Sequence, residues 1–324
     1  MTKKWFFFAI IAMLSVGLAF YACSNDDDDP CKDCEFGCED GKCLPEPDLN
    51  DPSLVAKDNL IAYFPFEGDG KCEKSGITPS NASTTPVTFP AGRRGKCFQG
   101  TDAATSGLLY ALPAGNKLRD LKAFTVAFWA KMVPNTVATT DAPEQMIFQI
   151  DGIEGDWVWG NLYFLQHRNW PEGETEKDRK FSEMDCVFYK YDDAVDWKRQ
   201  RGNDWFLDVT VSQWRHIICT YDNVTSKFHA YVNGVHITAF DGTDYAGVDR
   251  KQSEDGPALG DLKFKNAENF AIGAWIVRLQ GNDLLEENWA APYRGQLDEL
   301  RIYDRGLTAE EAKALYDAEV AQIN

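Results

Sequence analysis

Tryptophan is concentrated in one part of this sequence. Of its ten tryptophans, half lie between Asp151 and Trp205, among residues that are mostly polar. Tryptophan offers a flat apolar ring with a polar edge, which suits the CH faces of sugar rings. Nearby polar side chains, among them Asn161 and Asp185, could bond to hydroxyl groups. We therefore predict a glycan site built from Trp157, Trp159, Arg168, Trp170, Trp197 and Trp205.

The alternative is that these rings fill a second small core beneath an enlarged loop. Trp157 and Trp159 stand two apart and would share one face of an extended segment. Trp170 and Trp197 have the most polar neighbours, in what reads as loop, so they are the better candidates for exposure. Both interpretations stay open at the level of sequence.

Acidic residues offer little sign of catalysis. Glycoside hydrolysis by a retaining enzyme needs two carboxylates about 5 Å apart, one acting as acid and one as nucleophile. Glu183 and Asp185 are the nearest pair, but a chain with 51 acidic residues contains many such pairs. The sequence also has no Gly-x-Ser-x-Gly, no His-Glu-x-x-His and no phosphate-binding glycine loop. We predict no catalytic residue, and a binding protein in place of an enzyme.

The nine cysteines point to an oxidising compartment. If Cys23 carries a lipid, eight remain that can pair. Four of these lie close together and favour two disulfides, although four thiols at this spacing could also bind zinc. They are Cys31, Cys34, Cys38 and Cys43. A Cys72–Cys97 bridge is plausible, whereas Cys186 and Cys219 either pair or leave Cys219 as a buried thiol in an apolar strand.

The N-terminus reads as an export signal. Lys3 and Lys4 precede an apolar run that ends on Ala22, directly before Cys23. An uncleaved membrane helix is the alternative, because 18 residues are marginally enough to span a bilayer. The segment FYACSNDDDD resembles a bacterial lipoprotein signal, and the run Asp26–Asp29 resembles the tag that sends Bacteroidetes-type lipoproteins to the cell surface. The resemblance implies acylation of Cys23 and anchoring in the outer membrane, facing outward.

Charge excludes some partners. The formal net charge is -18, and loss of residues 1–22 would make the chain still more negative. Nucleic acid is not expected as a partner, because phosphate binding needs clustered Lys and Arg. Anionic lipid surfaces are disfavoured for the same reason, so any membrane contact is expected through the lipid anchor alone.

Three regions follow from these patterns. Residues 1–22 form the signal peptide, residues 23–54 an acidic linker with the cysteine-rich disulfide segment, and residues 55–324 the main domain. In the main domain, β-rich segments recur and turn residues separate them. In the segment 124–132, for example, every second residue is apolar, which predicts a strand with one face in a core.

Local signals add a hairpin and a helix. Asn233-Gly234 between two strand-like runs predicts a type I′ turn, flanked by His229 and His236 as ordinary strand residues. Thr308 followed by Glu311 predicts a capping box and a helix over 309–323. The fold class is all-β with a short C-terminal helix.

Several stretches together resemble the laminin G-like jelly rolls of the concanavalin A-like lectin and glucanase superfamily. They are YFPFEGDGK, FTVAFWAKM, QWRHIICTYDNVTSKFHAYVNG and YRGQLDELRIYDRGLTAEEAKALY. The resemblance implies two antiparallel sheets in a sandwich, with a packing role for Trp214 and His216. It covers both ends and the middle of the main domain, but the region from Asp151 to Asp204 matches poorly. A glycan or glycoprotein is the expected partner, and protein adhesion or scaffolding is the alternative.

Two further features bear on the resemblance. Family sixteen glycoside hydrolases show Glu-x-Asp-x-x-Glu, and here Phe188 stands at the third position after Glu183 and Asp185, so the set is incomplete. Related jelly rolls also hold a structural calcium ion, and this implies Asp298 as a ligand, with Glu67, Asp69 and Gly100 as weaker candidates. In the pattern QLDELRIYD, Asp298 is expected on the apolar side with Leu300 and Ile302. The alternative is that backbone amides alone hold it.

Overall fold

The computed structural model describes most of the main domain and little of the N-terminal region. The described residues are 38–39, 42–43, 51–133, 144–152, 160–170, 181–192, 195–201, 209–210, 212–237, 239–240, 243–244, 248–249, 256–281 and 290–323. The chain divides into two compact units, Met1–Pro47 and Asp48–Asn324. The boundary between the units falls within the stretch 44–54, which is rich in proline and polar residues.

The first unit contains one described feature, a pair of short antiparallel strands. Strand β1 (Cys38–Glu39) pairs with β2 (Lys42–Cys43), and Cys38 stands opposite Cys43. Cys31 and Cys34, like Cys23, lie outside the described residues. The two disulfides of this segment therefore stay a prediction.

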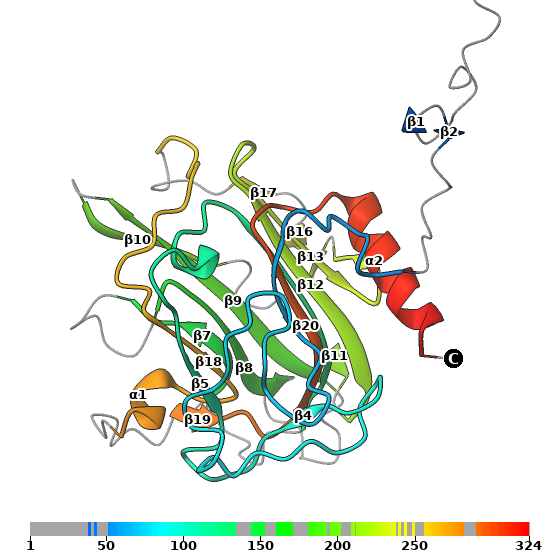
Figure 1. Ribbon diagram of the computed structural model, residues 1–324. Helices are drawn as coiled ribbons and strands as arrows, with labels where there is room; N and C mark the ends of the chain where they lie inside the picture. Colours follow the sequence, from blue (N-terminus) through cyan, green and yellow to red (C-terminus); the bar gives the residue numbers. More distant parts are fainter. Residues whose placement is uncertain are drawn as a thin grey trace, which may run out of the picture. The chain divides into compact units, whose positions relative to one another are not determined.

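The second unit is a sandwich of two sheets, as the resemblance implies (Figure 1). Sheet 1 has the order β14-β13-β12-β6-β20-β3, with β17 beside β13 and β4 beside β20. Its strands are β3 (Leu60–Phe64), β4 (Phe98–Gln99), β6 (Phe124–Lys131), β12 (Trp214–Asp222), β13 (Lys227–Val232), β14 (Val235–His236), β17 (Val248–Asp249) and β20 (Gln296–Tyr303).

Sheet 2 has the order β10-β9-β8-β7-β18-β5, with β11 beside β9 and β19 beside β7. Its strands are β5 (Leu108–Ala111), β7 (Glu144–Ile150), β8 (Leu162–Trp170), β9 (Phe181–Asp192), β10 (Val195–Arg201), β11 (Val209–Thr210), β18 (Asn269–Ile272) and β19 (Ala290–Pro292). Most pairs are antiparallel, whereas β19 runs parallel to β7. A separate two-stranded sheet joins β15 (Ala239–Phe240) and β16 (Thr243–Asp244), and the short helices η1 (Lys117–Arg119) and α1 (Ile276–Leu279) lie in connections.

The main core lies between the two sheets. In β6 the predicted face is confirmed: Phe124, Val126 and Phe128, followed by Ala130 and Met132, all belong to this core. The alternate residues Ala127 and Trp129 are also buried, on the opposite face of sheet 1. Strand β6 is therefore covered on both sides, which the alternation in its sequence does not reveal.

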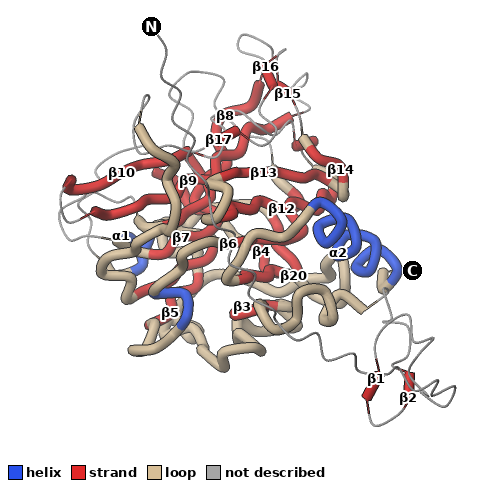
Figure 2. Tube along the Cα trace, turned by 90° about the horizontal axis from the view of Figure 1, so that it is seen from above, coloured by secondary structure: helices blue, strands red, loops and turns tan. Residues whose placement is uncertain are grey.

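Helix α2 (Ala309–Ala321) covers that opposite face of sheet 1 (Figures 1 and 2). Its Leu315 packs in a small cluster with Ala127, Ile218 and Tyr303 of the sheet. The predicted capping box is confirmed, because Thr308 Oγ1 accepts from the Glu311 amide at 3.2 Å and the Glu311 carboxylate accepts from the Thr308 amide at 3.0 Å. No helix among the described residues is long and apolar enough to cross a membrane.

The predicted tight turn is confirmed as well. Asn233 and Gly234 both have positive φ, 52° and 73°, as a type I′ turn requires. Strands β13 and β14 pair on either side of it, with Tyr231 opposite His236. This hairpin forms the edge of sheet 1.

A bulge in β20 overturns one expectation. The ladder with β6 shifts between Asp298 and Arg301, and Glu299 has a φ of +53°. The extra residue moves the alternation by one, so Leu300 faces the core while Asp298 stands opposite Trp129 on the helix-covered side. The prediction that Asp298 shares a face with Leu300 is therefore wrong, because a bulge leaves no mark in a period-two pattern.

The region from Asp151 to Asp204 supplies three of the eight strands of sheet 2. Strands β8, β9 and β10 all come from it. The apolar parts of β8 and β9 are visible in the sequence, but β10 reads as polar loop. It is an edge strand, and backbone pairing with β9 holds it whatever its side chains are.

Candidate functional site

The predicted tryptophans are divided between strands and segments outside the described residues. Trp157, Trp159 and Trp205 belong to the latter. Trp170 is the last residue of β8 and Trp197 lies within β10, so both expected loop positions are strand positions. Their side chains, like that of Arg168, lie outside the description.

Strand register separates Trp170 from Trp197. Trp170 pairs with Phe181 at the start of β9. Trp197 lies in β10 beside the end of β9, between the pairs Val195–Asp192 and Lys198–Lys190. Successive residues of a strand advance about 3.3 Å, so the two backbone positions lie toward opposite ends of sheet 2. One compact site cannot contain both residues, and an extended ligand along the sheet would be needed to contact the two.

A second aromatic cluster covers the outer face of β8 and β9, the face turned away from the main core. Tyr163, Tyr189 and Tyr191 belong to it, with Trp275 from the connection before α1. The rings of Tyr189 and Tyr191 are stacked at 5.7 Å, and Trp275 Nε1 donates to the Ala291 carbonyl at 3.1 Å. All four side chains are buried. These buried rings form a second small core, as the alternative interpretation expected. They are not, however, the five tryptophans that the sequence analysis named.

Polar side chains accompany that cluster. Asp185 on β9 is 1% exposed and stands opposite Leu165, and Asn161, directly before β8, is fully buried. The Asn161 amide accepts from the Lys265 amide at 2.9 Å and donates to the Lys265 carbonyl at 2.7 Å. Asn161 therefore holds two segments together, which corrects the expectation that it contacts sugar hydroxyls. The side chain of Glu183 lies outside the description.

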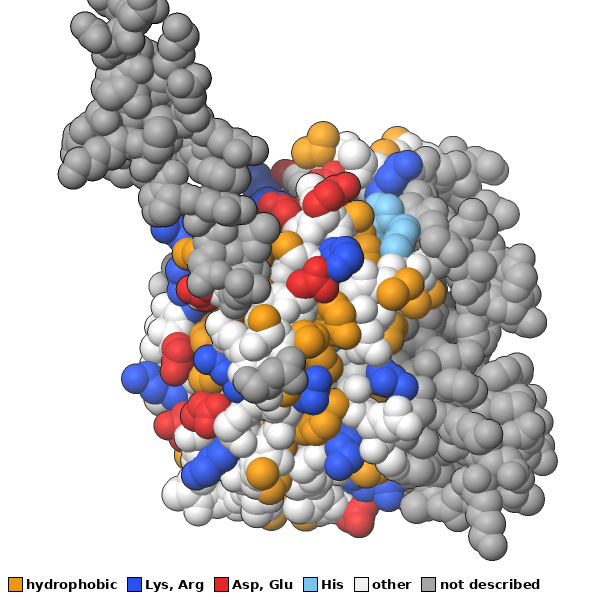
Figure 3. All heavy atoms as spheres, turned by 90° about the vertical axis from the view of Figure 1, so that its right-hand side faces the viewer, with side chains coloured by type: hydrophobic (Ala, Val, Ile, Leu, Met, Phe, Trp, Pro, Cys, Tyr) orange, Lys and Arg blue, Asp and Glu red, His pale blue; other side chains and the backbone are white. Residues whose placement is uncertain are grey.

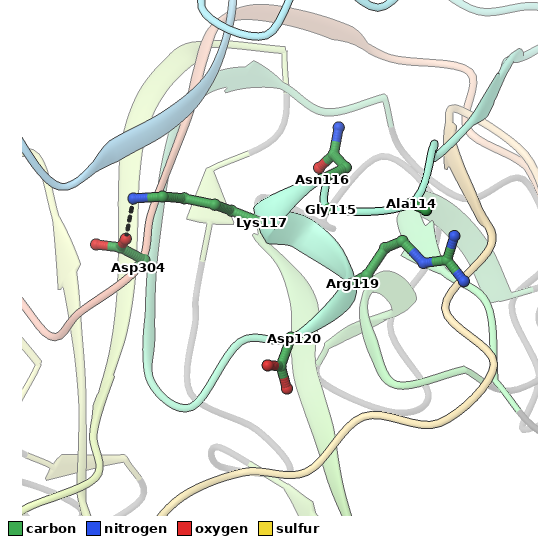
Figure 4. A pocket seen from close by; sticks show the side chains of 7 residues that line it. All are labelled: Ala114, Gly115, Asn116, Lys117, Arg119, Asp120 and Asp304. Carbon is green, nitrogen blue, oxygen red and sulfur yellow. Dashed lines mark hydrogen bonds and ion pairs between the residues drawn. The ribbon is translucent and has the colours of Figure 1, made fainter.

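A pocket opens at the connection between β5 and β6 (Figure 4). It has a volume of about 630 Å³ and is lined by Ala114, Gly115, Asn116, Lys117, Arg119, Asp120 and Asp304. Lys117 Nζ donates to Asp304 Oδ2 at 2.8 Å, and Arg119 extends in the opposite direction. Arg119 Nη1 donates to the Leu112 carbonyl at 3.1 Å. The sequence gives no sign of this pocket, because its polar residues read as an ordinary loop.

Three backbone amides hold the predicted calcium ligand Asp298. The amides of Arg93 and Arg94 donate to Oδ2 at 2.8 and 2.9 Å, and the Glu299 amide donates to Oδ1 at 2.9 Å. Burial raises the pKa of Asp298 to about 8, against the opposing effect of the amide hydrogen bonds. This arrangement corresponds to the alternative to a calcium ion, in which backbone amides alone hold the Asp298 carboxylate.

The other calcium candidates also accept hydrogen bonds from N–H groups. Glu67 Oε2 accepts from the Lys96 amide at 3.1 Å, Asp69 Oδ1 accepts from the Lys71 amide at 2.9 Å, and the Gly100 carbonyl accepts from Gln99 Nε2 at 2.8 Å. Within the described part of the chain, no three His, Cys, Asp or Glu side chains are grouped to hold a metal. The hydrogen bonds that Asp298 accepts come from N–H donors, which satisfy the carboxylate without a calcium ion. The ion itself stays a prediction from the resemblance.

The cysteines of the main domain correct the expected Cys72–Cys97 bridge. Both are buried free thiols. Cys72 Sγ accepts from the Tyr63 amide at 3.4 Å, and Cys97 Sγ donates to the Ala91 carbonyl at 3.7 Å. Cys219 is a buried free thiol too, which was one of its two alternatives. Cys186 lies buried in the same core.

Sequence reasoning missed a network of buried charges beneath α2. Arg301 on β20 donates to Glu319 of the helix, and at 2.8 Å to Glu299 Oε2. His216 Nε2 lies 3.2 Å from Glu319 Oε2, and all four side chains are at most 2% exposed. Burial acts to raise the pKa of Glu319, but Arg301 and then His216 hold it below its usual value. His216 thus helps to hold α2 on sheet 1 through a polar contact with Glu319, which is the form that its expected packing role takes.

Several solved structures are similar to this chain at low identity. Domain 4 of an extracellular arabinanase from Geobacillus stearothermophilus, in complex with arabinotriose, is 22% identical with a TM-score of 0.45, over 79% of this chain and 98% of that one. The binding domain of botulinum neurotoxin serotype G is 14% identical with a TM-score of 0.47, over 80% and 50%. A heptameric pentraxin from Limulus polyphemus is 14% identical with a TM-score of 0.38, over 67% and 78%. The chain spans about half the length of the toxin binding domains it matches.

No curated protein matches the chain. A family model does, over residues 104–313, and its description is the concanavalin A-like lectin/glucanases superfamily. The matched residues run from just before β5 into α2 and include most strands of both sheets. Since the match spans more than half of the sequence, this chain belongs to the concanavalin A-like lectin/glucanases superfamily.

Proposed function

We propose that this protein binds carbohydrate and is displayed on the cell surface by a lipid on Cys23. The observation that carries the binding proposal is the origin of β8, β9 and β10. Residues 151–205, which include all three strands, hold half of the tryptophans and build the edge of sheet 2. This concentration of tryptophan supports a recognition surface at this edge.

The described residues support the proposal in two further ways. The buried tyrosines on the outer face of β8 and β9 give that edge a packed base, so side chains mounted on it would be held in place. The pocket at η1 presents amide, carboxylate and cationic groups, the types that hydrogen-bond to sugar hydroxyls. The edge of sheet 2 is our first choice and the pocket the second.

Binding without hydrolysis is proposed because the acidic pair is not arranged for catalysis in the sequence. Phe188 occupies the third position of the hydrolase pattern and is buried in the main core. Asp185 is buried on the outer face of β9. A reducing-sugar assay on a panel of polysaccharides tests this directly, and release of sugar would replace the binding proposal with a glycosidase.

The deciding experiment for binding is a glycan array probed with the protein lacking residues 1–22. We expect the protein to be retained on a limited set of glycans and to be released when free oligosaccharide competes for binding. If no glycan is retained while the protein is folded, the proposal is wrong, and adhesion to a protein partner becomes the leading function.

A further inference from the structure

Two histidines meet at the hairpin edge of sheet 1. His229 lies on β13 and His236 on β14, joined by the tight turn at Asn233-Gly234. His229 Nδ1 lies 3.0 Å from His236 Nε2, and the ring of His236 stacks on Tyr231 at 4.9 Å between centroids. The hairpin and the stacked ring fix the approach of the two imidazoles.

Both histidines reach the surface. Each is half-buried, and Figure 3 shows histidine side chains as a small patch on the face it presents. Each of the two residues is therefore partly accessible from solution.

The separation of the nitrogens has the size that a metal chelate requires. Imidazole nitrogen binds transition metals at about 2.0–2.1 Å. Two nitrogens 3.0 Å apart would then subtend an angle of about 94° at the metal. That angle corresponds to neighbouring positions of a square-planar or octahedral ion, whereas a tetrahedral ion would need about 3.3 Å between the nitrogens.

We propose that His229 and His236 form a two-histidine site for a divalent transition metal such as Ni²⁺ or Cu²⁺. Tetragonal coordination by nitrogen and oxygen is typical of Cu²⁺ and Ni²⁺, and Cu²⁺ binds such ligands most tightly. The protein supplies two cis ligands, and water supplies the rest. The proposal goes beyond carbohydrate binding and does not depend on it.

Protonation supports this assignment. Burial, followed by the neighbouring His236, lowers the pKa of His229, which favours the neutral ring that a metal ion needs. In the metal-free pair, one ring holds a hydrogen between the two nitrogens. On binding, that proton moves to the outer nitrogen of its own ring, and the metal takes its place with no net release of a proton.

The test is calorimetric titration of the full chain with nickel chloride at pH 7.5. We expect one ion per chain whose binding requires both histidines, with at least a tenfold loss of affinity in His229→Ala and in His236→Ala. Val235→Ala, an exposed change on the same hairpin, should leave the isotherm unchanged. Any nickel that binds to cysteine thiols would bind to every variant. The ion that depends on the histidines is therefore the difference between the stoichiometry of the parent and that of the histidine variants.

Two measurements distinguish loss of the metal site from unfolding of the variants. Circular dichroism should show that each variant keeps its melting transition, and His229→Gln provides a polar replacement if His229→Ala does not fold. In the unchanged protein, substoichiometric Cu²⁺ should broaden the ring-proton resonances of His229 and His236 before those of other histidines. The site is ruled out if His229→Ala/His236→Ala binds nickel as the parent does, or if other histidine resonances broaden first.

Discussion

The indole of Trp129 in β6 donates from Nε1 to Glu319 Oε2 of α2 at 2.5 Å, across 190 residues of sequence. The same carboxylate accepts from Arg301 and lies 3.2 Å from His216 Nε2. One acidic side chain therefore connects the helix to three strands of sheet 1, namely β6, β12 and β20. A buried charge of this kind is stable only while its partners remain.

Removal of that carboxylate should destabilise the domain strongly. Glu319→Ala removes the buried acceptor of the Trp129 N–H and leaves Arg301 with Glu299 as its remaining carboxylate partner, so we expect the free energy of unfolding to fall by about 3–5 kcal/mol. Asp317→Ala is the matched control on the same helix. Its partner Lys313 is exposed, so the expected change is under about 1 kcal/mol. Urea denaturation of both variants measures the difference, and equal losses would contradict the structural role of Glu319.

The stability of the domain should depend on the ionisation of Asp298. Its pKa is raised to about 8 by burial, so the folded state binds a proton that the unfolded chain, with an ordinary pKa of 3.8, has released. Stability should then fall by roughly 1.4 kcal/mol per pH unit as the pH rises from about 4 to about 8, and level off above that. Urea denaturation across this range should show that the free energy of unfolding depends less on pH in Asp298→Asn. That variant lacks the proton that Asp298 releases on unfolding. Equal slopes, or a loss of stability only below pH 4, would show that the amides of Arg93, Arg94 and Glu299 keep the carboxylate ionised.

Calcium gives a separate test of the same residue. Both oxygens of Asp298 already accept from amides, so we expect the melting temperature of metal-stripped protein to be the same with calcium as with chelator. A specific site would instead add about 2.7 kcal/mol of stability at a hundredfold excess over its dissociation constant. A calcium-dependent rise that Asp298→Asn abolishes would therefore restore the prediction made from the resemblance.

Variants can locate the proposed glycan site. If the edge of sheet 2 binds the ligand, Trp197→Ala in β10 should lower retention on the array-selected glycan at least tenfold without changing the melting temperature. Asn116→Ala and Asp120→Ala, in the pocket at η1, serve as controls and should retain binding. Loss in the pocket variants alone would move the site there. Loss only in variants that also unfold would show that the tryptophans fill a core.

Surface display depends on Cys23. With Cys23 acylated, the protein should partition into detergent and be removed from intact cells by added protease. Cys23→Ala should abolish the detergent partition, because no other residue of the signal can take the lipid. A Cys31→Ala variant controls for loss of a nearby thiol. Protection of the protein in intact cells would contradict the outward orientation.

Local patterns in the sequence determined the parts of the fold that depend on neighbouring residues. The alternation in β6, the positive-φ turn at Asn233-Gly234 and the capping box at Thr308 were all predictable, because each needs only a few consecutive side chains. The family followed from several such stretches taken together. Edge strand β10 of sheet 2 was harder to predict, because backbone pairing with β9 holds it and its side chains carry no period.

Tertiary structure alone decided how distant side chains meet. A single extra residue at Glu299 turned Asp298 from the core to the helix-covered side and set Arg301 against Glu319. His229 and His236, two ordinary strand residues by sequence, were brought within 3.0 Å by the register of one hairpin. Such contacts depend on strand register and on bulges. A shift of one residue reverses every face in a strand, and no pattern in the chain records where that shift occurs.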